Sequence, residues 1–169
     1  MRHPLERIPK GWPRVAALLL LLGLTYWLRP RPEPALKTAQ AGWGIVSLEL
    51  AFTEERAGHL IASWGPARDA AIRLQAQDDI WLLVYSTTLA LACVMVSGRF
   101  AGLLAWAQWL AGLFDFLENR AISQMLAGAV AAPWPQVAGV CASLKFLLIL
   151  SGLVYLVSRL GSSFPAKDP

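Results

Sequence analysis

Long apolar segments separated by shorter polar ones are the main pattern along this chain. Such segments are typical of helices that cross a membrane, because about 20 apolar residues are needed to span the hydrocarbon core. Gly98-Arg99 predicts a tight hairpin, and Pro133-Trp134-Pro135 predicts the end of a helix. The pattern predicts four membrane helices, at about residues 14–29, 66–98, 100–132 and 136–159.

The first apolar run, Val15 to Leu28, has 14 residues, which is short for a membrane helix and also fits the core of a signal peptide. Ala39-Gln40-Ala41 has the small-x-small pattern of a cleavage site, but it lies well beyond the end of the run. We therefore favour an uncleaved first membrane helix, with its terminal arginines reaching the membrane surface.

The segment between the first two membrane helices, about residues 30–78, is more polar and is predicted to lie outside the membrane. Alternating prolines from Arg29 to Pro34 predict an extended spacer. Ile45 to Phe52 alternates between apolar and polar or small side chains, which predicts a short strand-like segment. Thr53 followed by two acids predicts the start of a helix, and Gly65-Pro66 predicts its end.

Composition agrees with a membrane protein, because 56% of the 169 residues are hydrophobic and only 15% are charged. In an average soluble domain, about a quarter of all residues are charged. We therefore predict an all-α fold, a polytopic membrane four-helix bundle with a helical extracytoplasmic extension, as a single domain over residues 1–169. The net charge of +4 is modest, so it predicts a basic rim facing the lipid bilayer and no nucleic acid partner.

The distribution of basic residues predicts the orientation in the membrane. Four basic residues precede the first apolar run, and Arg99 occupies the tight hairpin. Cytoplasmic loops of membrane proteins are enriched in lysine and arginine. Both termini are therefore predicted to be cytoplasmic, and the 30–78 loop is predicted to be extracytoplasmic.

Cysteines and histidines do not indicate a metal or redox site. Cys93 and Cys141 are predicted at opposite ends of their helices, about 20 Å apart in depth, which is beyond disulfide reach. His3 and His59 are isolated and are predicted to be ordinary surface residues. No cofactor or metal is predicted, although an all-carboxylate Mg²⁺ or Ca²⁺ site, with Lys145 as its competitor, stays open.

Asp115, Glu118 and Asn119 place polar side chains inside the third apolar segment, on one helical face because they stand at i, i+3 and i+4. Ionisable groups at membrane depth are costly and usually face a bundle interior or mark function. On the two helices joined by the Gly98-Arg99 hairpin, residues equally far along the chain from the hairpin lie at the same height. Asp79 is therefore predicted to lie level with Glu118. Lys145 on the fourth helix reaches the same height with its long side chain.

These groups predict a polar pocket in the outer half of the bundle, where small residues on facing helices allow close contact. Glu49 caps the pocket, Tyr85 adds a hydroxyl group, and Asp78 is predicted to be rotated away from it. Three carboxylates facing one lysine are not expected all to be ionised in a low-dielectric site. The predicted ligand-binding residues are Glu49, Asp79, Tyr85, Asp115, Glu118, Asn119 and Lys145.

Three functions fit this pocket. It can be an ion-pair network that fixes helix packing, or a site for a small polar molecule, lipid head group, proton or cation. A transport role would require a homo-oligomer or a membrane partner protein, because the sequence shows no internal repeat of the kind found in transporters. The third function is a lipid-modifying enzyme that uses Asp115 and Glu118 as acid and base with Lys145. No nucleophile elbow, phosphate loop or zinc motif occurs in the sequence, so we favour the first two.

The order of these residues resembles a set of small uncharacterised bacterial four-pass membrane proteins. The elements that carry the resemblance are Leu48-Glu49-Leu50-Ala51-Phe52-Thr53, Asp79 with Tyr85, Asp115-x-x-Glu118-Asn119, and Lys145. It covers about Ile45 to Arg159, and the Asp-x-x-Glu-Asn motif in the third helix is its most specific part. The resemblance implies the topology and a bacterial inner membrane, and it implies no activity.

Overall fold

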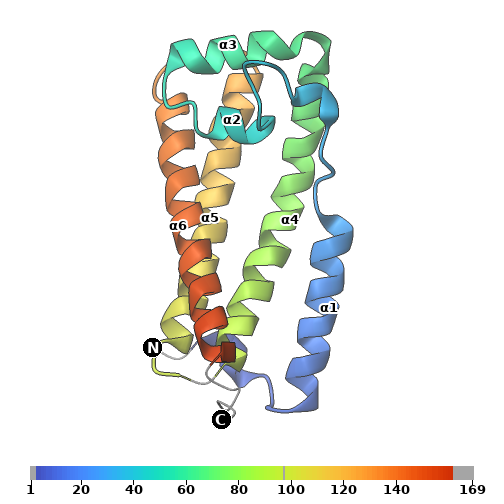
Figure 1. Ribbon diagram of the computed structural model, residues 1–169, viewed down its shortest axis with the longest axis vertical. Coiled ribbons are helices and arrows are strands. Elements are labelled where there is room, and N and C mark those ends of the chain that lie inside the picture. The colour runs from blue at the N-terminus through green and yellow to red at the C-terminus, as the bar shows by residue number, and fades with distance from the viewer. Residues whose placement is uncertain (1–2, 97, 162–169) are drawn as a thin grey trace, which may run out of the picture.

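The computed structural model describes residues 3–96 and 98–161, which are largely helical and contain no strand. Four long helices run along the long axis of the molecule (Figure 1), with two short α-helices and three 3-10 turns between or before them. The long helices are α1 (Trp12–Leu28), α4 (Arg68–Met95), α5 (Ala101–Leu126) and α6 (Trp134–Gly161). The short elements are η1 (Pro4–Arg7), η2 (Pro34–Leu36), α2 (Ile45–Glu49), α3 (Glu54–Trp64) and η3 (Gly65–Ala67). The predicted all-α class is confirmed.

The long helices pack as a central group with one peripheral member. Helix α5 packs against both α4 and α6, whereas α1 packs mainly against α4 (Figure 1). The prediction of a four-helix bundle is therefore not confirmed, because α1 lies outside the α4–α5–α6 group. Arg14 is the one buried side chain of α1, and apolar side chains of this helix such as Leu19 and Leu20 are exposed.

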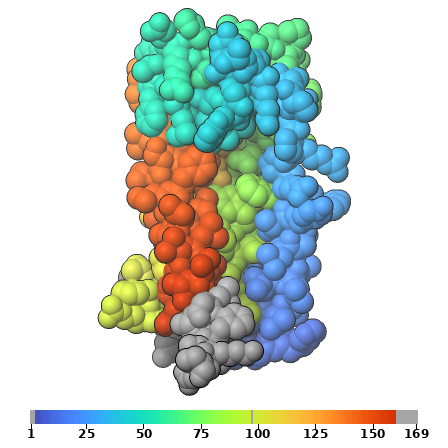
Figure 2. Space-filling model, viewed as in Figure 1, coloured from blue at the N-terminus to red at the C-terminus, as the bar shows by residue number. Residues whose placement is uncertain are grey.

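The two ends of the molecule differ. At one end, here called the cap end, α3 lies across the long helices, and α2 and the 29–44 linker fill the space beneath it (Figures 1 and 2). At the other, here called the hairpin end, α4 is followed directly by α5. Thr53 caps α3 as predicted, because its Oγ1 accepts a hydrogen bond from the Arg56 amide at 3.3 Å.

Each end has its own apolar core. The cap-end core joins side chains from the linker, α2 and α3 with α4, α5 and α6, among them Leu48, Trp64 and Ile122. The hairpin-end core contains Ala90, Cys93, Val94 and Ala105. Most of the small residues predicted to face neighbouring helices are buried, including Ala111, Ala138 and Ala142, whereas Ala101 is only partly buried and Ser97 lies outside the described residues. Cys93 and Cys141 are both buried and free, as predicted.

The predicted strand-like segment is wrong, because residues Ile45–Glu49 form helix α2. A single strand would leave its amide and carbonyl groups without partners, and no second strand exists in the described chain to supply them. The alternation also did not separate a buried from an exposed face, since the successive residues Leu48 and Glu49 are both buried.

The third long helix ends earlier than predicted, at Leu126 rather than near Ala132. Gly128 adopts φ +111°, a left-handed conformation that glycine tolerates and that turns the chain out of the helix. The Arg68 guanidinium on α4 donates its Nε hydrogen bond to the Leu126 carbonyl at 3.0 Å, which satisfies a carbonyl freed at the helix end.

His3 is buried, contrary to the prediction of a surface position, with 1% of its surface exposed. Its ring centroid lies 4.8 Å from Trp106 and 4.3 Å from Trp109, so the N-terminal segment packs against α5. His3 Nδ1 accepts a hydrogen bond from the Leu5 amide at 3.3 Å. Burial lowers the pKa of His3 by disfavouring its charged form, while nearby Glu6 acts in the opposite direction.

Two described helical stretches, within Glu54–Met95 and Trp134–Arg159, are long and apolar enough to cross a membrane by length and composition. Helix α1 is also apolar but has 17 residues. The two stretches give weak evidence for membrane association, so a four-pass topology stays a prediction at this point.

Candidate functional site

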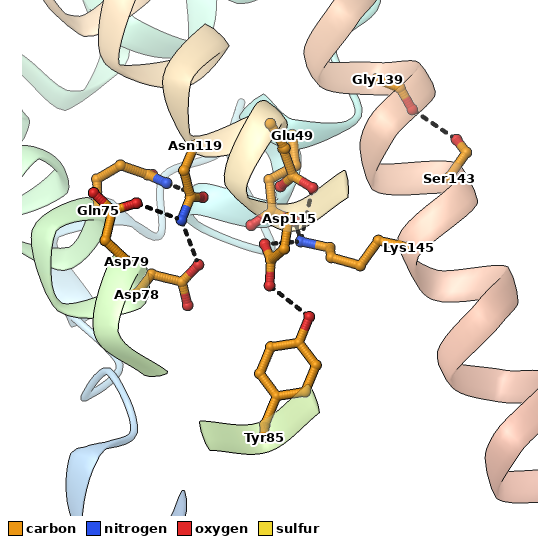
Figure 3. Close-up of polar contacts among 11 residues, drawn as sticks. Glu49, Gln75, Asp78, Asp79, Tyr85, Asp115, Asn119, Gly139, Ser143 and Lys145 are labelled. Atoms are coloured by element: carbon orange, nitrogen blue, oxygen red, sulfur yellow. Dashed lines mark hydrogen bonds and ion pairs between the residues drawn. The ribbon is translucent and has the colours of Figure 1, made fainter. Parts of the chain in front are cut away.

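Lys145 on α6 is the centre of a buried charged cluster (Figure 3). Its Nζ lies 2.9 Å from Asp115 Oδ1, 2.8 Å from Glu118 Oε2 and 3.5 Å from Glu49 Oε2. Asp115 and Glu118 both come from α5, where their i, i+3 spacing places them on the face toward α6. Glu49, the last residue of α2, brings the cap into the same cluster.

Tyr85 on α4 completes the surroundings of Asp115. Its hydroxyl group donates a hydrogen bond to Asp115 Oδ2 at 2.6 Å, while Asp115 Oδ1 receives the Lys145 ammonium group (Figure 3). Both carboxylate oxygens of Asp115 are therefore engaged by donors. Since Asp115 is 2% exposed and Tyr85 6%, this contact ties α4, α5 and α6 together away from solvent.

A second set of polar contacts connects α5 to α4 through Asn119. The Asn119 amide donates to Asp78 Oδ2 at 3.0 Å and to Asp79 Oδ1 at 3.2 Å, and its carbonyl oxygen accepts from Gln75 (Figure 3). Asp79 also forms an ion pair with Arg120, in which the side chains are 29% and 47% exposed. Asn119 is therefore buried beside the Lys145 cluster, whereas the Asp79–Arg120 pair lies at the surface.

The Lys145 cluster carries more carboxylates than cationic groups. Glu49, Asp115 and Glu118 face one ammonium group, so their full ionisation would leave a net charge of −2. Three of their oxygens, Glu49 Oε2 and both oxygens of Glu118, are buried without a hydrogen-bond partner in the described chain, although Glu49 Oε2 and Glu118 Oε2 lie within ion-pair distance of Lys145 Nζ. Buried carboxylates without donors are costly. The arrangement is therefore suited to accept a cationic group or protons.

Glycines set the close approach of the elements around the cluster. A Cβ atom on Gly112 of α5 would lie 2.9 Å from Ser86 Oγ on α4, so glycine is needed for this contact between helices. A Cβ atom on Gly139 of α6 would meet the Phe52 ring, and Phe52 has the positive φ of 60° that few non-glycine residues adopt. Gly139 thus leaves room for the chain segment that follows α2. This close packing places Glu49 beside Lys145.

A pocket of about 230 Å³ opens beside the cluster at the cap end. Its walls come from the linker, α2 and α4, and the polar side chains nearest the cluster are Glu49, Gln75 and Asp78. A second pocket of about 270 Å³ lies between α4 and α5, where Gln75, Asp79 and Arg120 contribute to its lining. Glu49 thus belongs both to the buried cluster and to the lining of the first pocket.

The structure brings together most of the residues predicted from the sequence. Glu49, Tyr85, Asp115, Glu118 and Lys145 form the buried cluster, and Asn119 lies next to it. Asp79 contacts Asn119 and Arg120, close to the predicted height but at the edge of the site.

Asp78 was predicted to be rotated away, and this is wrong, because it shares the Asn119 amide with Asp79. Sequence reasoning also missed Gln75 and Arg120. The i, i+3 spacing of Gln75 and Asp78 on α4 is the signal that could have identified this face.

Within the described residues, no group of three or more histidine, cysteine or acidic side chains is arranged to hold a metal ion. Lys145 Nζ occupies the position between the carboxylates of the cluster that a cation would need. Searches against protein-family models, curated proteins and solved structures found no match for this chain. The resemblance to small four-pass bacterial membrane proteins therefore stays a prediction.

Proposed function

We propose that this chain is an integral membrane protein in which α1, α4, α5 and α6 cross the bilayer. The support is the number of large apolar side chains on the outer surfaces of these helices. Leu19 is 57% exposed, Leu103 67% and Leu147 63%. Soluble monomers rarely expose contiguous apolar patches larger than a few hundred Å². A bilayer would cover these side chains, and each helix would satisfy its own backbone hydrogen bonds.

The charge distribution supports cytoplasmic termini. Arg7, Lys10 and Arg99 lie at the hairpin end, where the described chain both begins and ends (Figure 1). Positive charge of this kind favours the cytoplasmic side of a membrane. The short helices α2 and α3 would then lie on the opposite side, and the membrane would be the inner membrane if the host is bacterial.

The labelling test introduces Arg56→Cys at the cap end or Lys10→Cys at the hairpin end. A membrane-impermeant maleimide should label the first in intact cells and the second only after permeabilisation, and the opposite result would invert the topology.

We propose further that the cap-end pocket binds a small polar molecule that carries an amine or a similar cationic group. The observation that carries this proposal is the position of Glu49, which lines the pocket and also joins the carboxylate-rich cluster. A ligand cation at this position would contact Glu49 and Asp78 and offset the excess negative charge beside Lys145. The volume of about 230 Å³ suits a molecule smaller than most drug-sized ligands.

The buried carboxylates influence the charge of the preferred ligand more strongly than the exposed basic residues of the pocket do. Arg31 and Lys37 also line the pocket, but both are exposed to solvent, which screens their charge. Glu49 is 9% exposed, so its interaction with a bound cation is weakened less by water. The pocket therefore selects for positive charge at its inner end and tolerates a neutral or acidic group at its opening.

The ligand test compares small amines with neutral molecules of similar size. Ethanolamine and putrescine should raise the melting temperature of the detergent-solubilised protein. Their neutral counterparts, ethylene glycol and 1,4-butanediol, should not. Asp78→Asn should remove this effect, whereas Asp69→Asn, an exposed acid on the same helix, should retain it. Equal effects of amines and neutral analogues, or equal loss in both variants, would contradict the proposal. Native mass spectrometry of the parent protein would report retained ligand and any self-association or membrane partner together.

A structural network is the second candidate, and one observation favours it. The cluster joins α2, α4, α5 and α6 through Lys145, Asp115 and Tyr85, so it would hold four elements in register even without a ligand. The enzyme alternative has less support, because neither Asp115 nor Glu118 lines either cap-end pocket.

A further inference from the structure

A larger cavity, here called the basin, opens at the hairpin end, far from the Lys145 cluster. It has a volume of about 1220 Å³ and lies between the N-terminal segment, the end of α4 and the beginning of α5. The residues that matter for its chemistry are Lys10, Arg14, Val15, Arg99, Leu103 and Trp106. The basin therefore combines basic side chains with an apolar wall.

The basic side of the basin has a buried foundation. Arg14 is 9% exposed, and its guanidinium group donates to the Ile8 carbonyl at 2.8 Å and to the Glu6 carbonyl at 2.7 Å. These two bonds fix the turn that places Lys10 at the basin, and they leave further N–H donors on Arg14. Lys10 and Arg99 are exposed and add two positive charges.

Glu6 is the one acidic residue among the described residues that line the basin. Its Oε1 already accepts a hydrogen bond from the His3 amide at 3.0 Å, within the N-terminal turn. Three basic residues against one acid leave the basin with a net charge of +2. This charge is complementary to an anionic ligand.

The apolar wall indicates which anionic ligand fits. Leu103 is 67% exposed and Trp106 39%, and both face outward from α5 within the proposed membrane region. Tryptophan is enriched where a membrane protein meets the lipid head groups. A free phosphate ion would use the basic residues but would leave the apolar wall and most of the volume empty.

We propose that the basin binds one anionic phospholipid. Its phosphate group lies at Lys10 and Arg99, and an acyl chain runs along Leu103 and Trp106. Basic pockets of this kind on the cytoplasmic side of membrane proteins suit acidic head groups. The inference rests on the proposed membrane location but is independent of the cap-end ligand, because the two sites lie at opposite ends of the protein.

The test measures lipid binding to the full-length protein in detergent by native mass spectrometry, with phosphatidylglycerol and phosphatidylcholine as probes. The parent protein should retain phosphatidylglycerol preferentially. Lys10→Gln with Arg99→Gln should weaken that binding about thirtyfold, because each basic residue near an acidic head group contributes about a factor of five. The matched control, Arg56→Gln with Arg73→Gln, removes two exposed charges outside the basin and should change the affinity less than twofold.

Three results would overturn the proposal. Equal retention of phosphatidylglycerol and phosphatidylcholine would show no selection for the acidic head group. An equal loss in the control pair would show a general effect of net charge. Displacement of the lipid by millimolar inorganic phosphate would assign the basin to a free anion. Because Lys10 and Arg99 are exposed, unchanged melting temperatures are expected and would separate lost binding from lost folding.

Discussion

Replacing Lys145 with methionine tests whether the buried cluster depends on its ammonium group. The substitution keeps much of the side-chain volume but leaves Glu49, Asp115 and Glu118 without the cation that contacts all three. Breaking a buried ion pair from one side costs about 3–5 kcal/mol. The carboxylates can escape this cost by taking up a proton, which costs an ordinary glutamate about 4 kcal/mol at pH 7, from a reference pKa of about 4.3. The two routes agree, so we expect Lys145→Met to lower the free energy of unfolding by about 4 kcal/mol.

The assay is equilibrium unfolding of the purified protein in mixed detergent micelles at pH 7 and pH 5. Protonating an ordinary glutamate costs only about 1 kcal/mol at pH 5, so the penalty of Lys145→Met should shrink toward that value. Arg120→Met is the matched control, because the Arg120–Asp79 pair is largely exposed and such pairs contribute about 0–1 kcal/mol. If Lys145→Met costs no more than Arg120→Met, or if its cost does not depend on pH, the charge argument for this cluster is wrong.

Three further predictions follow from single contacts. Glu118→Gln should recover at least about 1 kcal/mol of unfolding free energy in the Lys145→Met background, because it removes one uncompensated charge, and a double-mutant cycle measures this coupling. Gly112→Ala should cost about 1–3 kcal/mol, because its Cβ atom would lie 2.9 Å from Ser86 Oγ, and Ser86→Gly should relieve much of that loss in thermal unfolding. Burial lowers the pKa of His3, so the undocked N-terminal segment binds a proton more readily than the docked one. Docking should therefore weaken as the pH falls below about 6.5, seen as faster proteolysis of the segment, and His3→Phe should remove this pH dependence.

The features that the sequence predicted well are those that helical geometry determines. Apolar runs and the proline and glycine residues around them located the four long helices. The rise per residue then set relative heights across the α4–α5 turn. Asp79 was placed level with Glu118, and it contacts the next two residues, Asn119 and Arg120. Tyr85 and Asp115 also meet across the same pair of helices. Height along a bundle is therefore predictable from one chain when a tight turn fixes the register.

Rotation and tertiary burial were harder to predict. Asp78 and Asp79 are neighbours on α4, and both accept from Asn119 because its amide group has two hydrogens. Ideal helix geometry, with 100° of rotation per residue, assigns Asp78 and Asp79 to different faces of α4. One Asn119 side chain can nevertheless contact both. His3 has no local signal of burial, since the tryptophans that cover it lie about a hundred positions away on α5. Helix α2 depends equally on distant contacts, because a helix of 5 residues has little stability of its own.

The composition of the Lys145 cluster argues for a bound partner more strongly than its position does. A network that only fixed helix packing would need Lys145, Asp115 and Tyr85, in which both oxygens of Asp115 are engaged and α4, α5 and α6 are joined. Glu118 and Glu49 add two further carboxylates around the same ammonium group, and Glu118 Oε1 is buried without a hydrogen-bond partner in the described chain. Because one ammonium group cannot neutralise three buried carboxylates, the two added glutamates destabilise the cluster in a way that helix packing does not explain. A cationic ligand entering beside Glu49 would supply the charge that Lys145 alone cannot, and it would make the ligand-bound state the one in which the cluster is balanced.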